Sequence, residues 1–205
     1  MSTIAQIRQE PTSEPNPAHS FARQQLGSER DTLLAIFEPE VNLAVWQRAC
    51  SPAIDTYCQV LLEQLSLPLQ RMLPIHDIAS ALTAALPAGS GKAEFVADVQ
   101  LLADIFGCLM DCPQLGLRLR VLEKPMCPKF HTDHLVCRLV CTYSGPTTEW
   151  HGGPIARPET TMQLQTADVA LLKGSGWEGS QCHAISHRSP STAGKRLLLT
   201  LDPVW

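Results

Sequence analysis

The chain has 205 residues, of which 44% are hydrophobic and 18% are charged, and its formal net charge is −4 at pH 7. This composition is that of a globular protein with apolar mass for one or two cores, and it excludes fibrous, collagenous and fully disordered chains. The negative net charge argues against nucleic acid as a partner, because such binding depends on cationic side chains that meet phosphates. Residues 117–205 nevertheless carry 10 Lys and Arg against 7 Asp and Glu, which suits a small anionic ligand.

The sequence contains no apolar run long enough to span a membrane, which takes about 18 residues or more. Its first ten residues have no apolar core of the kind that a secretory signal needs. We therefore expect a cytoplasmic protein with no membrane partner. The eight cysteines are then expected to be reduced thiols, metal ligands or small core residues, and not disulfides.

The N-terminal part of the chain divides into a tail and a helical region. Residues 1–27 are rich in Ser, Pro, Gln and Asn and have no apolar periodicity, which predicts a disordered tail. Ser28 and Asp31 have the spacing of a capping box, and Ser51-Pro52 is typical of a helix start. Apolar residues recur at helical spacing after Ser51 and again after the Gly89–Gly91 break. We expect residues 28–115 to be helical.

Beyond residue 116 the apolar pattern changes to that of strands. The expected strands are 117–122, 135–143, 168–172, 182–187 and 195–201. Five short strands with no helix between them predict an antiparallel sandwich or barrel. The fold class expected is therefore α+β, with an N-terminal helical layer packed on a C-terminal jelly-roll-like barrel over residues 116–205.

The last of these strands has two different faces. Side chains alternate along a strand, so Leu197, Leu199 and Leu201 face one way, and Arg196, Leu198, Thr200 and Asp202 face the other. Three leucines on one face are best explained by packing against the helical layer. Arg196 then points into the barrel, where a buried guanidinium needs an anionic ligand or a buried carboxylate.

The strongest candidate for chemistry is His131-Thr-Asp133, followed by His187 and then by Arg196. Side chains at positions i and i+2 of an extended segment point the same way, so His131 and Asp133 can bind one ion. If the strand of His187 lies across the barrel, its imidazole is a third ligand. Two histidines and one carboxylate form the open face that suits Fe(II). Arg196 could then hold a carboxylate through two parallel hydrogen bonds.

These residues, with the segment from Arg138 to Tyr143 and the run from His187 to Arg196, resemble the Fe(II)- and 2-oxoglutarate-dependent oxygenases. The resemblance is to the double-stranded β-helix fold and, within it, to the prolyl-hydroxylase-like branch. It implies that His131, Asp133 and His187 are iron ligands and that Arg196 anchors the far carboxylate of 2-oxoglutarate. It also makes Arg138, Tyr143 and Thr200 candidates for cosubstrate binding. Many relatives place a hydroxyl two residues after the anchoring arginine, where this chain has Leu198, and Thr200 is the nearest substitute.

A narrower resemblance covers most of the chain after the tail. The segments Cys127–Asp133, Gly145–Trp150 and His187–Pro190 look like an uncharacterised bacterial family named domain of unknown function 1826. Its members often sit beside CobW-type metallochaperone GTPases in zinc-responsive gene clusters. This implies a role in metal limitation and a metallochaperone partner, without defining a reaction.

The rival interpretation is a non-catalytic zinc-binding protein of metal homeostasis. Thiolates and imidazoles together bind Zn²⁺, and Cys127, Cys137, Cys141 and Cys182 could form such a cluster, although the chain has no C-x-x-C pair. Zinc is therefore the alternative to iron as the native metal.

Other residues near the candidate ligands have structural explanations. Alternation turns His134 away from Asp133, and His183 is explained as a hydrogen-bonded core residue. Arg138 is either a second anion anchor or the partner of Glu149 or Asp202. The primary substrate, a small molecule or a protein side chain, is expected to depend on the loop of residues 144–166.

Overall fold

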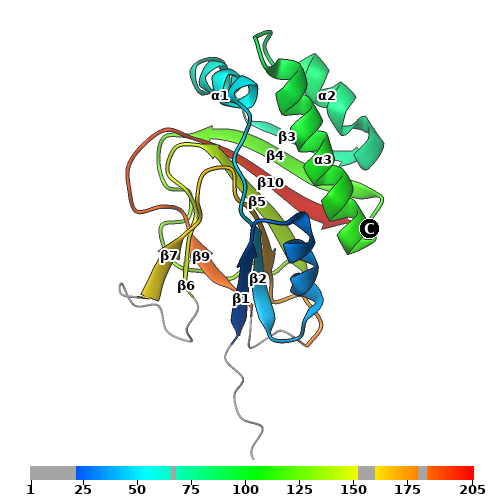
Figure 1. Cartoon of the computed structure of the whole chain (residues 1–205), viewed down its shortest axis with the longest axis vertical. Coiled ribbons are helices and arrows are strands. Elements are labelled where there is room, and N and C mark those ends of the chain that lie inside the picture. Colours follow the sequence, from blue (N-terminus) through cyan, green and yellow to red (C-terminus); the bar gives the residue numbers. More distant parts are fainter. Residues whose placement is uncertain (1–21, 66–67, 152–159, 180–183) are drawn as a thin grey trace, which may run out of the picture.

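The computed structural model describes residues 22–65, 68–151, 160–179 and 184–205. Over these residues the fold is mixed α+β with two β-sheets. The larger sheet has seven strands in the order β1-β2-β8-β5-β10-β4-β3, and the smaller sheet has the order β7-β6-β9 (Figure 1). The expected fold class is thus confirmed at the level of an α+β protein with two sheets.

The large sheet is built from both halves of the chain. Its strands are β1 (Arg23–Gly27), β2 (Val41–Trp46), β3 (Leu69–Pro74), β4 (Gln114–Leu122), β5 (Cys137–Ser144), β8 (Val169–Lys173) and β10 (Arg196–Val204). Only the pairing of β1 with β2 is parallel among the described pairs. β10 lies between β4 and β5, so that its residues have neighbours on both sides.

The small sheet consists of short strands. They are β6 (Glu149–His151), β7 (Thr161–Gln163) and β9 (Ser186–Arg188). β6 is the central strand and pairs antiparallel with both neighbours, and Trp150 lies directly opposite His187. This sheet brings residues from three distant parts of the chain to one side of the large sheet.

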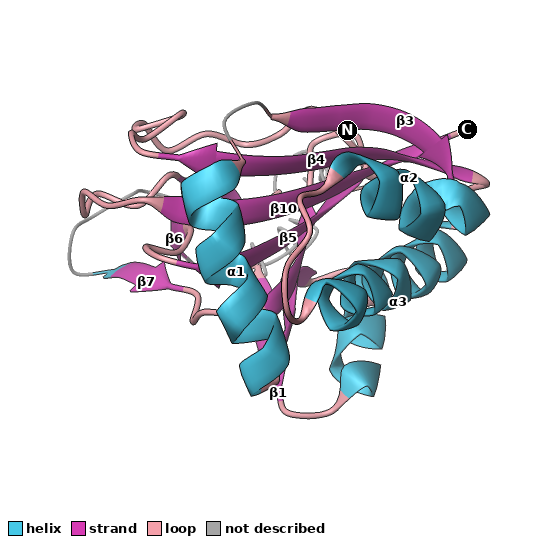
Figure 2. Cartoon of the chain, turned by 90° about the horizontal axis from the view of Figure 1, so that it is seen from above, coloured by secondary structure: helices cyan, strands magenta, loops and turns pink. Residues whose placement is uncertain are grey.

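Three α-helices cover the other face of the large sheet, as Figure 2 shows: α1 (Pro52–Gln64), α2 (Ile78–Ala85) and α3 (Lys92–Met110). α1 begins as the sequence predicts, because the Ser51 hydroxyl accepts a hydrogen bond from the backbone N–H of Ile54, and Pro52 occupies the first turn. α3 begins after Gly91, whose φ of 85° is the left-handed conformation that glycine adopts most easily. The helices bury Tyr57 and Phe95 against the sheet.

The N-terminal half is not all helical, which corrects the expectation for residues 28–115. β2 and β3 lie in this range and join the large sheet. The predicted capping box is also wrong: residues Arg30–Phe37 form the 3-10 helix η1, whose cap is Glu29, without a side-chain hydrogen bond. A second 3-10 helix, η2, covers Ile75–Asp77. The expected disordered tail of residues 1–27 is too long, because Arg23–Gly27 form β1; residues 1–21 lie outside the described residues.

The two faces of the large sheet have different surroundings. The helix-facing core contains Leu197, Leu199 and Leu201, as the alternation of the last strand predicts. The other face looks toward the small sheet, where a smaller apolar cluster includes Val140, Trp150 and Ala170, with Leu198 packed against it. A cavity on this face is lined by both apolar and charged residues and forms the site described below.

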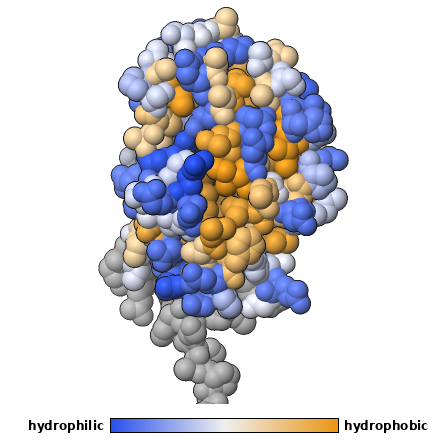
Figure 3. Space-filling model, turned by 45° about the vertical axis from the view of Figure 1, so that its right-hand side comes forward, coloured by the Kyte–Doolittle hydropathy of each residue, from blue (hydrophilic) through white to orange (hydrophobic). Residues whose placement is uncertain are grey.

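The outer surface of the helical side keeps some apolar side chains in solvent. Figure 3 shows them gathered on the face where the right-hand side of Figure 1 comes forward. Exposed large hydrophobic residues of η1 and α3 are Leu34, Phe37 and Leu101. Within the described part of the chain, no helix combines the length and the apolar character needed to cross a membrane.

Candidate metal centre

Two histidines lie opposite each other at the edge of the small sheet. His131 pairs with His187 in an isolated antiparallel bridge, in which each backbone N–H donates to the carbonyl of the other residue, at 3.0 and 2.9 Å. Directly opposite residues of an antiparallel pair carry their side chains on the same face. The two imidazole rings are accordingly 4.6 Å apart, measured between their centroids.

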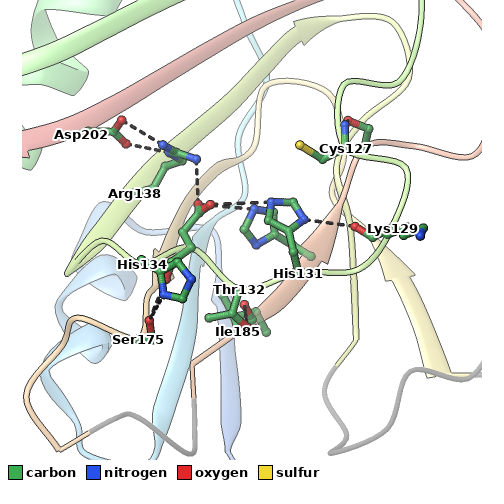
Figure 4. A network of polar contacts seen from close by, with 12 residues as sticks. Cys127, Lys129, His131, Thr132, His134, Arg138, Ser175, Ile185 and Asp202 are labelled. Carbon is green, nitrogen blue, oxygen red and sulfur yellow. Dashed lines mark hydrogen bonds and ion pairs between the residues drawn. The ribbon is translucent and has the colours of Figure 1, made fainter.

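Asp133 completes a group of three potential ligands with His131 and His187. Figure 4 shows the surroundings of this group, with His131, Arg138 and Asp202 labelled. Its carboxylate oxygens lie 3.7 Å from Nε2 of His131 and 3.5 Å from Nε2 of His187. One ligand atom from each of the three residues lies within 4.8 Å of the others. The structure thus brings together the three predicted ligands, although His187 follows Asp133 by 54 residues in the sequence.

The carboxylate of Asp133 is held by Arg138, which also binds Asp202. Nη1 of Arg138 donates a 2.8 Å hydrogen bond to Asp133, while its Nε and Nη2 donate to the two oxygens of Asp202 at 2.7 and 2.9 Å. Arg118 donates a further short hydrogen bond to Asp202. Of the alternatives left open by the sequence, Arg138 is therefore the partner of Asp202, and it also orients Asp133.

The backbone of the H-x-D segment is fixed by the turn after β8. The N–H of Ser175 donates to the carbonyl of Asp133 at 2.9 Å, and the N–H of Gly174 donates to the carbonyl of Val136 at 2.9 Å. A Cβ at position 174 would lie 2.0 Å from the carbonyl oxygen of Leu135, so only glycine allows this close approach. His134 turns outward, where its ring contacts the Ser175 hydroxyl at 3.0 Å, as alternation predicts.

His187 is buried, and burial lowers its pKa to about 4 despite the nearby carboxylate of Asp133. The imidazole is therefore neutral at pH 7. The neutral form has a free lone pair on one nitrogen, which is the form that binds a metal. The local electrostatics thus favour a ligand role for His187.

A cavity of about 240 Å³ opens beside the three residues, and both His131 and His187 line it. Arg196 lines it too, as the sequence predicts, and is 4% exposed. Its Nη2 donates to the hydroxyl of Ser189 at 3.2 Å, but its buried Nη1 has no hydrogen-bond partner. Burial lowers the pKa of Arg196 to about 10, so the side chain is still a cation at pH 7.

The other two cosubstrate candidates lie on opposite sides of the large sheet. Thr200 lines the cavity, on the same face of β10 as Arg196. Tyr143 does not: its ring packs on Phe95 of α3, and its hydroxyl donates a 2.6 Å hydrogen bond to Asp98. The prediction that Tyr143 binds the cosubstrate is wrong, because residues 138 and 143 on one strand differ by an odd number and face opposite ways.

The described cysteines of the rival zinc interpretation do not lie together. Cys137 and Cys141 are fully buried in the helix-facing core, where burial raises the pKa of the Cys137 thiol to about 12. Cys127 is exposed and lines the cavity, on the other side of the sheet. Cys182 and His183 lie outside the described residues. The seven cysteines of the described part of the chain are free thiols.

Comparison with known proteins places the chain in a family. The family model described as "Protein of unknown function (DUF1826)" matches residues 27–202. The chain belongs to the DUF1826 family. No curated protein matches it.

Solved structures show the fold of this DUF1826 member. The dioxygenase for auxin oxidation 1 from Arabidopsis thaliana, solved as a binary complex with 2-oxoglutarate, has a TM-score of 0.57 at 11% identity; the match covers 89% of this chain and 92% of that chain. The dioxygenase for auxin oxidation in rice has a TM-score of 0.51 at 12% identity, over 89% of this chain and 83% of that chain. At such low identity the likeness shows a fold resembling that of 2-oxoglutarate-dependent oxygenases.

Several residues around the DUF1826 cavity were not predicted from the sequence. Among them are Arg118, Arg120, Arg188 and Ser189. A signal for the first two exists in Leu117-Arg-Leu-Arg-Val121, where strand alternation places both arginines on one face. Arg188 forms an ion pair with Glu149 and lies over the Phe130 ring at 4.5 Å, whereas Ser189 bonds Arg196.

The donor set fits a divalent metal with an acidic cosubstrate. Two imidazole nitrogens and one carboxylate converge, and such a set would leave a bound metal with open positions of the kind that non-haem iron uses. The unpartnered Nη1 of Arg196 in the same cavity fits a carboxylate, since a buried guanidinium is costly without an anion.

Proposed function

We propose that the protein is an Fe(II)- and 2-oxoglutarate-dependent oxygenase. The observation that carries the proposal is the convergence of His131, Asp133 and His187 beside the unsatisfied guanidinium of Arg196. Metal ligands and an anion anchor in one small cavity are what this chemistry requires. The fold, which resembles that of such oxygenases, supports the proposal, and we include in it a closure of the two sheets into a double-stranded β-helix barrel.

Each residue has a defined task in this proposal. His131, Asp133 and His187 would hold Fe(II), which with 2-oxoglutarate supplies the activation of O₂ that side chains alone cannot provide. Arg196 binds the far carboxylate of the cosubstrate through its free Nη1, assisted by Thr200 on the same face of β10. Arg138 keeps the carboxylate of Asp133 oriented by linking it to Asp202.

The interior is suited to a reaction that excludes water. The apolar cluster around Trp150 and Leu172 occupies the space between the sheets. His187 and Arg196 are almost completely buried at its polar border. Buried polar groups beside an apolar cluster strengthen the electrostatic contacts of bound ligands.

Zinc is the alternative metal for the same three ligands. Zn²⁺ also accepts imidazole and carboxylate ligands, and it would give a metal-binding protein without oxygenase activity. The cysteines that would favour zinc are divided between two faces of the sheet, so iron is the better proposal. A metallochaperone GTPase as partner, and a cytoplasmic location, stay predictions.

The test is cosubstrate turnover with a defined metal. Protein purified without oxygen is loaded with Fe(II) or Zn²⁺, given 2-oxoglutarate and exposed to O₂, and succinate is quantified. We expect succinate from the Fe(II) form and none from the Zn²⁺ form or from Asp133→Ala. Equal succinate from Asp133→Ala and the parent protein, or none from a form shown to bind both Fe(II) and 2-oxoglutarate, would overturn the proposal.

A further inference from the structure

The cavity beside the metal ligands is more cationic than the proposed cosubstrate requires. Five arginines line it: Arg118, Arg120, Arg138, Arg188 and Arg196. No Asp or Glu is among its described lining residues. Three of these arginines contact a carboxylate just outside the cavity, Asp202 for two of them and Glu149 for one.

Arg120 and Arg196 differ from the other three. The structure shows no acidic partner for either of them among the described residues. Arg120 donates a 2.7 Å hydrogen bond to the amide oxygen of Gln70, and its Nη1 approaches the sulfur of Met126 at 3.5 Å. Its Nε is buried and has no hydrogen-bond partner. One cavity therefore holds two unneutralised guanidinium groups with an unused nitrogen each.

The two groups occupy different places on the same face of the sheet. Arg196, at the start of β10, lies opposite Leu122 of β4. Arg120, on β4, lies opposite Leu198 of β10. They are diagonal neighbours, whose side chains are near but reach different positions. Arg120 is also next to the segment that contains Met126 and Cys127, which form another part of the cavity wall.

We propose that the primary substrate is a small carboxylic acid and that Arg120 binds its carboxylate. This inference rests on the proposed oxygenase function, in which Arg196 is already occupied by 2-oxoglutarate. Arg120 then supplies the second anion position. The guanidinium favours carboxylate because its fork of N–H groups matches the two oxygens. Arg120 is only half-buried, but its Nε is buried without a partner and its charge has no carboxylate nearby, and a ligand that brings the negative charge explains both.

The size of the cavity supports a small substrate. Its volume of about 240 Å³ is below the roughly 300–1,000 Å³ of common ligand pockets. Part of that space is needed for 2-oxoglutarate. A bulky ligand would have to extend outside, so a compact acid fits the remaining room and the remaining charge.

Acetate is the smallest probe of this position, and acetamide is its neutral control. The protein is loaded with Mn(II), which takes the same ligand types as Fe(II) and speeds the relaxation of nearby protons. With 2-oxoglutarate saturating and oxygen excluded, methyl-proton relaxation is measured while acetate or acetamide is titrated. Loss of Mn(II) or 2-oxoglutarate binding would be a failure of the proposed function and would show itself before any acetate is added.

We expect saturable relaxation for acetate and none for acetamide. Arg120→Gln should weaken acetate binding about tenfold or more, since one charge-assisted contact is lost. Arg71→Gln is the matched control, because Arg71 is exposed on the adjacent β3 and does not line the cavity; it should bind acetate like the parent protein.

Three results would overturn the inference. Equal relaxation of acetate and acetamide would show that binding does not depend on the carboxylate charge. Acetate that binds only when 2-oxoglutarate is left out would assign Arg120 to the cosubstrate instead. If inorganic phosphate displaced acetate at a concentration below that at which acetate binds, the site would be a phosphate site and not a carboxylate site.

Discussion

The two faces of the large sheet show how one set of strands serves stability and chemistry separately. On β10, Leu197, Leu199 and Leu201 are buried against the helices, where each loses its contact with water. The alternate residues Arg196 and Thr200 line the cavity on the opposite face. The helix-facing side is apolar and filled, and the cavity-facing side carries charge and space. The difference indicates that the fold depends on one face and function on the other.

The cavity-facing side is costly to the folded protein. Arg196 is desolvated and retains an unpartnered nitrogen, and burial lowers its pKa to about 10. A group in this condition destabilises the folded state, and proteins keep such groups mainly where activity needs them. The predictions below separate the two faces, from the largest expected effect to the smallest.

Removal of a metal ligand should have the largest effect. Asp133→Ala takes away the only carboxylate of the three-residue group, and we expect stoichiometric Fe(II) binding to be lost while the fold persists. His134→Ala is the control, since this neighbouring histidine faces outward to Ser175 and should leave the metal content unchanged. Metal analysis after anaerobic loading, with circular dichroism for the fold, checks both. Equal metal content in the two variants would contradict the assignment.

Substitutions of two neighbouring leucines of β10 compare how much each face of the sheet contributes to stability. Leu199→Ala removes a fully buried side chain from the helix-facing core and should lower the free energy of unfolding by about 2–5 kcal/mol. Leu198→Ala faces the cavity, where space already exists, and should cost about 1 kcal/mol. Urea unfolding of both variants measures the difference. A larger loss for Leu198→Ala would contradict the division between the faces.

The anchor arginine should show its effect in ligand affinity. Arg196→Lys keeps the charge but loses the fork of donors, so 2-oxoglutarate should bind about tenfold or more weakly, which corresponds to roughly 1.5–3 kcal/mol for a charge-assisted hydrogen bond. Calorimetry on the Mn(II)-loaded protein measures this affinity. Arg71→Lys, on the outer strand, should bind like the parent. If Arg196→Lys also bound like the parent, the anchor would have to be sought at Arg138.

The turn behind the H-x-D segment should affect the metal without supplying a ligand. In Gly174→Ala the new Cβ would meet the Leu135 carbonyl, which has to move, at about 1–3 kcal/mol of strain. We expect weaker metal binding, because this turn fixes the backbone of Asp133. Gly116→Ala is the control, since its nearest atoms would be 3.7 Å away. Metal titration that gave the same affinity for both variants would show that the turn does not position the ligand.

Acid should weaken the protein modestly through Glu149. Burial raises the pKa of this carboxyl, but the hydrogen bonds from Ser191 and the ion pair with Arg188 outweigh it, and the pKa lies below the ordinary 4.5. A carboxyl with a lowered pKa stabilises the fold above its unfolded pKa, and this stability is lost as pH falls through the folded value. Glu149→Gln should therefore cost about 1 kcal/mol at pH 7 and lose less stability below pH 4.5. Parallel pH curves for variant and parent would contradict this.

In the C-terminal half, the sequence predicted β4, β5, β8 and β10 but not the short strands β6 and β7. The leucines of β10 and the polar residues between them identify both faces without a structure. The N-terminal strands were not predictable in the same way. β2, Val-Asn-Leu-Ala-Val-Trp, is short and largely buried, so its apolar run cannot be distinguished from a helix segment by periodicity. β3 is an edge strand with exposed polar residues and lacks a clear pattern.

The residues of the candidate site were predictable where the family motif and the alternation of side chains along a strand place a residue on the same face. His131, Asp133, His187 and Arg196 follow from the motif. The structure brings the first three together, and His131, His187 and Arg196 line one cavity. Tyr143 was carried over from a family pattern against the parity of its own strand. The sequence offered Glu149 and Asp202 as possible partners of Arg138, and the register of β5 and β10 decides for Asp202.

The most direct test of the account is anomalous diffraction from crystals of the protein with Mn(II) and 2-oxoglutarate, grown without oxygen. The account predicts one metal peak bound by His131, Asp133 and His187, with the far carboxylate of 2-oxoglutarate bound to Arg196 on the cavity face of β10. A metal bound elsewhere, for example at Cys127, or 2-oxoglutarate placed away from Arg196, would contradict it.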